Sequence, residues 1–185
     1  MDERLTLDWR SFLLRPEPRE SQPSRPRNSR SRLEGYEPRA QFRPRPEGTM
    51  TAGSGLLALE AAKAAAEQGP ELFRRYHQRL FSAQFHESLD IGNLAELAAL
   101  AEQEGLDPRP ITAALSDHRY RPAVMTEYQE ALRFGIQAIP TVLFVDATAA
   151  GPAKAVPVVG AVETDIYRQA IAYLEKLVVE ESLSD

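Results

Sequence analysis

One stretch decides the fold of this chain: Gly135-Ile136-Gln137-Ala138-Ile139-Pro140-Thr141-Val142-Leu143-Phe144. In it, a β-branched and apolar run begins directly after Pro140. Proline has no N–H to give to a sheet, so it is confined to the start of a strand, to an edge or to a bulge. The stretch therefore predicts a strand over residues 141–145 that is entered through a turn constrained by Pro140. From the residues alone we expect the Ile139–Pro140 bond to be trans, which is the ordinary state of a bond before proline.

Strands are also predicted on both sides of this stretch. Residues 155–160 predict a second strand after a loop, and Pro157 within them indicates an edge strand. At the other end of the chain, Leu5, Leu7 and Trp9 alternate with polar residues, which is the period of a strand with one buried face.

Helices are predicted between these strands and at the end of the chain. Asn93 and Asp107 stand where helix N-caps are expected, and Gly69-Pro70 separates two helical segments. The predicted helices cover residues 56–68, 70–81, 93–105, 122–134 and 164–179, and a further helix is predicted to begin at Asp107-Pro108.

Charge is distributed unevenly along the 185 residues. The net charge is −5, yet residues 15–46 hold nine arginines against four glutamates, together with seven of the fourteen prolines. This composition offers too few aliphatic side chains to offset the entropy of ordering, so it predicts a long mobile loop. Arginines can contact the phosphates of nucleic acids. We do not expect this chain to bind nucleic acid, however, because stacking aromatics are lacking and the remainder of the chain is acidic.

The chain contains no cysteine, which excludes disulfides, cysteine-ligated zinc and thiol catalysis by these residues. His77, His86 and His118 lack the spacing of a metal motif, so neither a metal nor a cofactor is expected. No apolar run approaches the ~18 residues of a membrane span, and the charged opening residues do not resemble a signal peptide. We therefore expect a cytoplasmic protein without a membrane partner.

Several short motifs resemble, in the same order, the DsbA-like thioredoxin-fold oxidoreductases and their FrnE-like branch. They are residues 8–16 (Asp-Trp-Arg-Ser-Phe-Leu-Leu-Arg-Pro), the apolar helical stretch after Gly55, the segment 73–105 and the Gly-Ile-Gln-Ala-Ile-Pro-Thr run at 135–141. The resemblance implies an α/β thioredoxin-like fold with an all-helical insertion and family activity in protein thiol–disulfide exchange. It also implies a cis bond before Pro140.

The resemblance also implies a site and an omission. In the family the backbone before the cis proline binds an extended peptide or a small thiol compound, which corresponds here to Ala138, Ile139 and Pro140. The family also carries a strand and a Cys-x-x-Cys helix ahead of the equivalent of residues 4–9. This first βα unit is absent from the sequence, so we expect a truncated product or a reading frame whose start was placed too far downstream.

One domain is expected, in four parts. They are a core strand in residues 1–14, the Arg/Pro-rich loop in 15–52, the helical insertion in 53–135 and a C-terminal β-hairpin and helix in 136–185. Three functions remain open. In the first, the chain is a family member that is redox-inert without cysteine. In the second, it is a non-catalytic module for a peptide or protein partner, and in the third it is a relative of glutathione-dependent isomerases and transferases. Neither the oligomeric state nor a catalytic residue follows from the sequence.

Overall fold

The computed structural model describes residues 5–17, 20, 22–23, 46–147 and 155–182. They form two compact units, of which the first ends at Glu130 and the second begins at Ala131. Within the described residues no helix is both long and apolar enough to cross a membrane.

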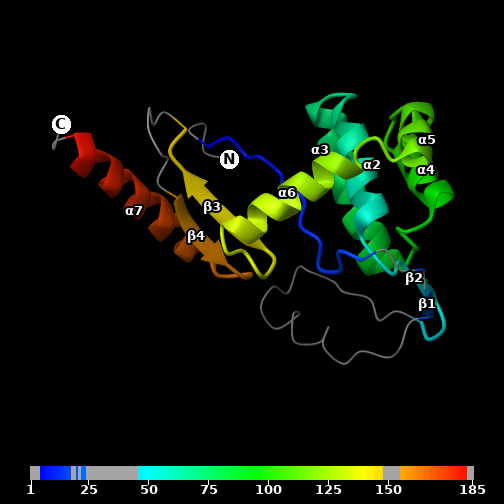
Figure 1. The fold of residues 1–185 in the computed structure, drawn as a ribbon, viewed down its shortest axis with the longest axis horizontal. Helices are drawn as coiled ribbons and strands as arrows, with labels where there is room; N and C mark the ends of the chain where they lie inside the picture. Colours follow the sequence, from blue (N-terminus) through cyan, green and yellow to red (C-terminus); the bar gives the residue numbers. More distant parts are fainter. Residues whose placement is uncertain (1–4, 18–19, 21, 24–45, 148–154, 183–185) are drawn as a thin grey trace. The chain divides into compact units, whose positions relative to one another are not determined.

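The first unit is helical (Figure 1). Its elements are α2 (Leu56–Ala66), α3 (Pro70–Ser82), the π-helical turn η1 (Ala83–Glu87), α4 (Leu94–Gln103), α5 (Pro108–Asp117) and α6 (Arg121–Arg133), whose last turn belongs to the second unit. The helices predicted between residues 56 and 134 are confirmed, with ends shifted by one or two residues, as fraying makes usual.

Two of the predicted helix caps are formed by side chains. The Asn93 side-chain oxygen accepts hydrogen bonds from the N–H groups of Ala95 (2.8 Å) and Glu96 (3.3 Å). Asp107 does the same for the N–H of Arg109 (3.0 Å), and Pro108 occupies the first helical position, where no N–H is needed. These carboxamide and carboxylate oxygens satisfy N–H groups that the helices themselves leave open.

The core of this unit lies among α2, α3, α4 and α5. Leu97 and Ile111 are completely buried, and the buried Tyr76 hydroxyl donates to the Leu97 carbonyl oxygen at 3.0 Å. Burial raises the pKa of Tyr76 above its ordinary value, because the phenolate would lose its water. The buried side chains of this cluster are Ala58, Ala61, Ala64, Ala65, Tyr76, Leu80, Ala83, Leu97, Leu100, Ala101, Leu106, Ile111, Ala114 and Leu115.

A carboxylate also lies inside the helical unit. Glu60 of α2 is fully buried and accepts a hydrogen bond from Arg121 Nε at 2.9 Å, while its other oxygen lies 3.2 Å from His118 Nδ1. His118 caps the end of α5 in the left-handed conformation (φ 55°). Because a buried charge is tolerated only when it is paired, these contacts connect α2 to the junction of α5 and α6.

The N-terminal segment corrects one prediction. Residues 5–14 have no strand assignment, and Leu5, Leu7 and Trp9 are 38, 56 and 49 % exposed. A strand requires a neighbouring backbone, and these residues have no ladder partner among those the model describes. The segment is held by other contacts: Ser11 N–H donates to Glu127 Oε2 at 2.7 Å, and Leu13 is buried.

The Arg/Pro-rich tract is described only at its ends. There, β1 (Gln22–Pro23) pairs antiparallel with β2 (Met50–Thr51), and the Thr51 hydroxyl donates to the Gln22 carbonyl oxygen at 3.1 Å. The prediction of a mobile loop falls otherwise on residues 18–19, 21 and 24–45, which lie outside the described residues.

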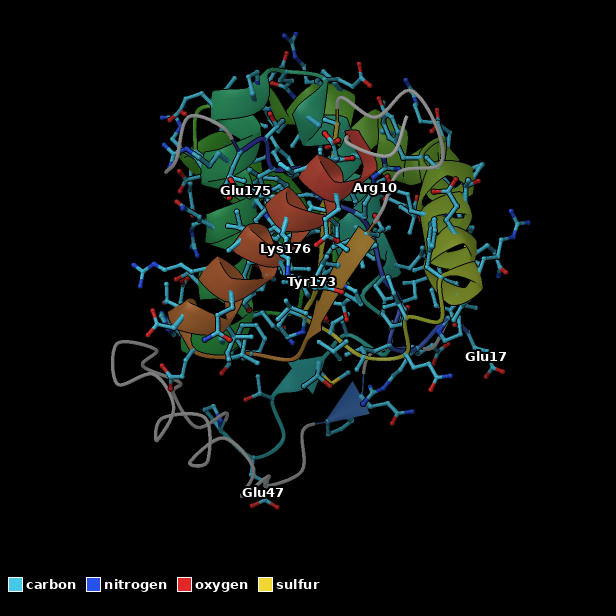
Figure 2. The ribbon with its side chains drawn as sticks, turned by 90° about the vertical axis from the view of Figure 1, so that its left-hand side faces the viewer. Arg10, Glu17, Glu47, Tyr173, Glu175 and Lys176 are labelled. Carbon is cyan, nitrogen blue, oxygen red and sulfur yellow. The ribbon has the colours of Figure 1, made fainter. Side chains whose placement is uncertain are left out.

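The second unit is a β-hairpin with one helix. β3 (Thr141–Val145) pairs antiparallel with β4 (Ala155–Val159), and α7 (Thr164–Ser182) packs on this hairpin. Phe144 meets Tyr167 of α7 edge to face, with ring centroids 6.3 Å apart. The face of α7 that bears Tyr173 is exposed, and Figure 2 shows Tyr173, Glu175 and Lys176 projecting from this helix. Both predicted strands and the terminal helix are confirmed.

Truncating a core leucine tests the packing of the helical unit. Leu97→Ala should lower the free energy of unfolding by about 2–5 kcal/mol, because it removes buried methyl groups and leaves a cavity. Leu14→Ala is the matched control: Leu14 is 68 % exposed, so the same change should cost less than about 0.5 kcal/mol. Denaturant unfolding followed by the fluorescence of Trp9, the only tryptophan, measures both. Equal losses for the two variants would contradict this core.

Candidate functional site

Helix α6 ends in a turn that directs the chain into the segment before β3. Gly135 adopts φ +73°, a conformation that costs glycine little. Its N–H bonds to the Leu132 carbonyl at 3.0 Å, and the N–H of Ile136 bonds to the Ala131 carbonyl at 2.9 Å. This pair of bonds is the Schellman motif, which satisfies the last carbonyls of a helix. Gly135 thus ends the helix and begins the loop of residues 135–140, here called the proline loop.

Two hydrogen bonds hold the proline loop to the hairpin. The Thr141 hydroxyl donates to the Ala138 carbonyl at 2.7 Å, and the Gly160 N–H donates to the Pro140 carbonyl at 2.7 Å. The peptide bond between Ile139 and Pro140 is cis. Within the described part of the chain, no bond engages the backbone of Ile139.

The bond between Gly160 and Pro140 also fixes the phase of the β3–β4 ladder. Pro140 lies opposite Gly160 by continuation of the register, so this is a hydrogen-bonded pair and every second pair after it is also hydrogen-bonded. The pair of Leu143 and Pro157 falls between them, at a position where neither residue bonds to the other strand. Pro157 therefore removes no bond from the hairpin, which explains why β4 tolerates a proline.

A cavity of about 370 Å³ lies beside the proline loop, entirely within the second unit. Its walls come from the loop and from the sheet face opposite α7. They consist of Phe134, Gly135, Ile136, Gln137, Ala138, Thr141, Leu143, Ala155, Pro157 and Val159. None of these side chains is charged, and only Gln137 and Thr141 have polar side chains. The cavity suits an uncharged, largely apolar group.

The three residues predicted for the site are adjacent in the sequence, but they differ in whether they line the cavity. Ala138 lines the cavity, whereas Ile139 (46 % exposed) and Pro140 lie on the loop outside its lining. Sequence reasoning missed the sheet contribution, above all Leu143, Pro157 and Val159. The alternation of residues in the two strands was the available signal, because strand residues two apart share a face.

No metal or acid–base site accompanies the cavity. Among the described residues, no group of three or more histidine or acidic side chains is placed to hold a metal. His77 lies between the rings of Trp9 (4.4 Å) and Phe73 (5.4 Å), where burial lowers the pKa of its imidazole. His118 contacts Glu60. Since these histidines belong to the helical unit and the cavity wall carries no nucleophile stronger than a hydroxyl, the cavity can bind but has no evident chemistry.

Comparisons with known proteins found a similar structure and a similar sequence. A structure described as "a putative protein disulfide isomerase from Nitrosomonas europaea" superposes with a TM-score of 0.65 over 84 % of this chain and 77 % of that one, at 16 % sequence identity. The uncharacterized protein YwbO of Bacillus subtilis (strain 168) is 32 % identical over 105 residues. That match covers 55 % of this chain and 46 % of YwbO, so the chain spans about half the length of this curated relative.

The family model agrees with the structural likeness. The DSBA-like thioredoxin domain matches residues 2–172, which is most of the chain. The predicted class, an α/β thioredoxin-like fold with a helical insertion, is confirmed by this match and by the superposition. The chain therefore belongs to the family of DSBA-like thioredoxin domains.

Proposed function

We propose that this chain is a redox-inert thioredoxin-fold module that binds an extended, uncharged peptide segment at the proline loop. The observation that carries the proposal is the uncharged cavity beside a loop whose Ile139 backbone is unengaged within the described residues. An extended peptide can be recognised by main-chain hydrogen bonds alone, while neighbouring pockets select its side chains. In the loop formed by Ala138, Ile139 and Pro140, the Ile139 backbone would supply the main-chain hydrogen bonds, and the sheet face would supply the pocket.

The lining of the cavity favours a peptide over glutathione. Glutathione carries two carboxylates and an ammonium group at neutral pH, and such groups need ionic or hydrogen-bonding partners when they leave water. The cavity wall offers no charged side chain. An apolar side chain needs no such partner and gains from burial, at about 25 cal/mol per Å² of apolar surface. This difference ranks peptide binding above the alternative of a glutathione-dependent isomerase or transferase.

Redox inertness is proposed from chemistry. Disulfides are formed, broken and rearranged by attack of a thiolate on a disulfide sulfur. Without cysteine, this chain has no thiolate to attack with and no disulfide to transfer. Family activity in thiol–disulfide exchange would therefore need sulfur that these residues do not contain.

A charge on the cavity wall should weaken peptide binding. The probe is a capped, uncharged eight-residue peptide in which valine alternates with serine, and its binding is measured by fluorescence anisotropy. Ala138→Glu should weaken binding at least about tenfold, or ~1.4 kcal/mol, because a carboxylate would have to be desolvated against an apolar ligand.

The matched control is Ala172→Glu, the same substitution at an exposed position of α7 in the same unit. It should leave the affinity unchanged. Equal weakening by both variants would contradict the site, as would no binding to the unsubstituted chain. Binding of glutathione in place of the peptide would favour the glutathione-dependent alternative.

The redox proposal has an independent test. Reduction of insulin by dithiothreitol should proceed at the same rate with and without this chain, since no thiolate can relay electrons. A DsbA-like protein that contains a Cys-x-x-Cys motif serves as the positive control. Acceleration by the cysteine-free chain would refute inertness whatever the peptide measurements give.

A further inference from the structure

His118 stands at the junction of α5 and α6, where one of its ring nitrogens meets two partners. Its Nδ1 lies 3.2 Å from Oε2 of Glu60, on α2, and 2.9 Å from Nη2 of Arg121, at the start of α6. An imidazole nitrogen either carries a proton and donates or has a lone pair and accepts. Nδ1 therefore cannot serve both partners at once, because the carboxylate only accepts and the guanidinium only donates.

Burial decides which of the two partners Nδ1 serves. Glu60 is fully buried, and within the described residues the one hydrogen-bonding contact of its Oε2 is with Nδ1. Without a proton on Nδ1 this buried oxygen would lack a donor, which costs a charged group more than a neutral one. The Arg121 side chain is 37 % exposed, and its Nε already donates to Oε1 of Glu60 at 2.9 Å. Its Nη2 can therefore bond to water when Nδ1 does not accept from it.

We propose that Glu60 holds His118 in the form with a proton on Nδ1, and that Nε2 is the nitrogen that gains and loses a proton as the pH changes. The side chain of His118 is 45 % exposed, so water reaches part of it. Histidine is the side chain whose charge ordinarily changes between about pH 5 and pH 8. In acid the contact from Nδ1 to Oε2 persists and becomes charge-assisted. The connection between α2 and the α5–α6 junction is thus retained in both charge states and is stronger when His118 is charged.

The other ionisable neighbours of His118 are engaged elsewhere. Asp117 and Arg119 form an ion pair with each other, at 2.6 Å between Oδ2 and Nη2. Tyr120 packs against the core of the helical unit. Within the described part of the chain, none of these three side chains bonds to the His118 ring. Glu60 and Arg121 are therefore the groups that decide where the proton resides.

Nitrogen NMR of the isotopically labelled full chain tests the proposal, because protonated and unprotonated ring nitrogens resonate at well-separated shifts. At about pH 8, Nδ1 of His118 should have the shift of a protonated nitrogen and Nε2 that of an unprotonated one. When the pH is lowered to about 5, only Nε2 should move to the protonated position. An unprotonated Nδ1 at the higher pH, or a mixture of the two forms, would overturn the proposal.

Two substitutions separate the roles of the partners. In Glu60→Gln the carboxamide oxygen would accept from Arg121 Nε and the NH₂ group would face Nδ1, so the proton of neutral His118 should move to Nε2. Arg121→Lys is the control: it retains a cation beside Glu60 but has no Nη2, so Nδ1 should stay protonated.

An unchanged proton position in Glu60→Gln, or loss of the Nδ1 proton in Arg121→Lys, would contradict the role given to Glu60. If either variant does not fold, the titration of the unsubstituted chain decides the question alone.

Discussion

One hydrogen bond, from the Gly160 N–H to the Pro140 carbonyl, constrains both the proline loop and the hairpin of the second unit. It ties the proline loop to the end of β4 and fixes which alternate pairs of the hairpin are hydrogen-bonded. From this phase follow the harmless position of Pro157 and the identity of the backbone groups that β3 turns away from β4. The residues of β3 and β4 that line the cavity of the proposed peptide site are brought together by this register.

The helical unit contains one fully buried carboxylate, Glu60, and one partly buried carboxylate, Glu127, and both are paired. Glu60 is fully buried against Arg121 and His118, and Glu127 contacts both Lys63 and the backbone of Ser11. Removing one partner of a buried ion pair typically costs about 3–5 kcal/mol, because the remaining charge stays out of water. The carboxylate of Glu127 also explains how residues 5–14 stay attached without a sheet: the backbone of Ser11 bonds to a side chain of α6.

For this chain, the sequence predicts local structure better than it predicts contacts between segments that are distant in the sequence. Asn93, Asp107 and Gly135 act within a few residues of their positions, so their caps could be read from the chain. The alternation of Leu5, Leu7 and Trp9 is typical of a strand, but the predicted strand does not form. Strand formation depends on a neighbouring backbone elsewhere in the chain, which the alternation does not reveal. For the same reason the site was predicted only in part. Ala138 precedes an informative proline, whereas Leu143 and Pro157 join the cavity through a register that no local motif encodes.

The proposed function describes a thioredoxin-fold scaffold with a binding loop and without sulfur chemistry. The binding part of this proposal rests on the hairpin, and NMR can measure the phase of the β3–β4 ladder directly. In pairs that are not hydrogen-bonded the two Hα atoms are close, so we predict strong Hα–Hα nuclear Overhauser effects between Thr141 and Val159 and between Leu143 and Pro157. Strong effects between Val142 and Val158 in their place would contradict the phase, and with it the account of why β4 tolerates Pro157.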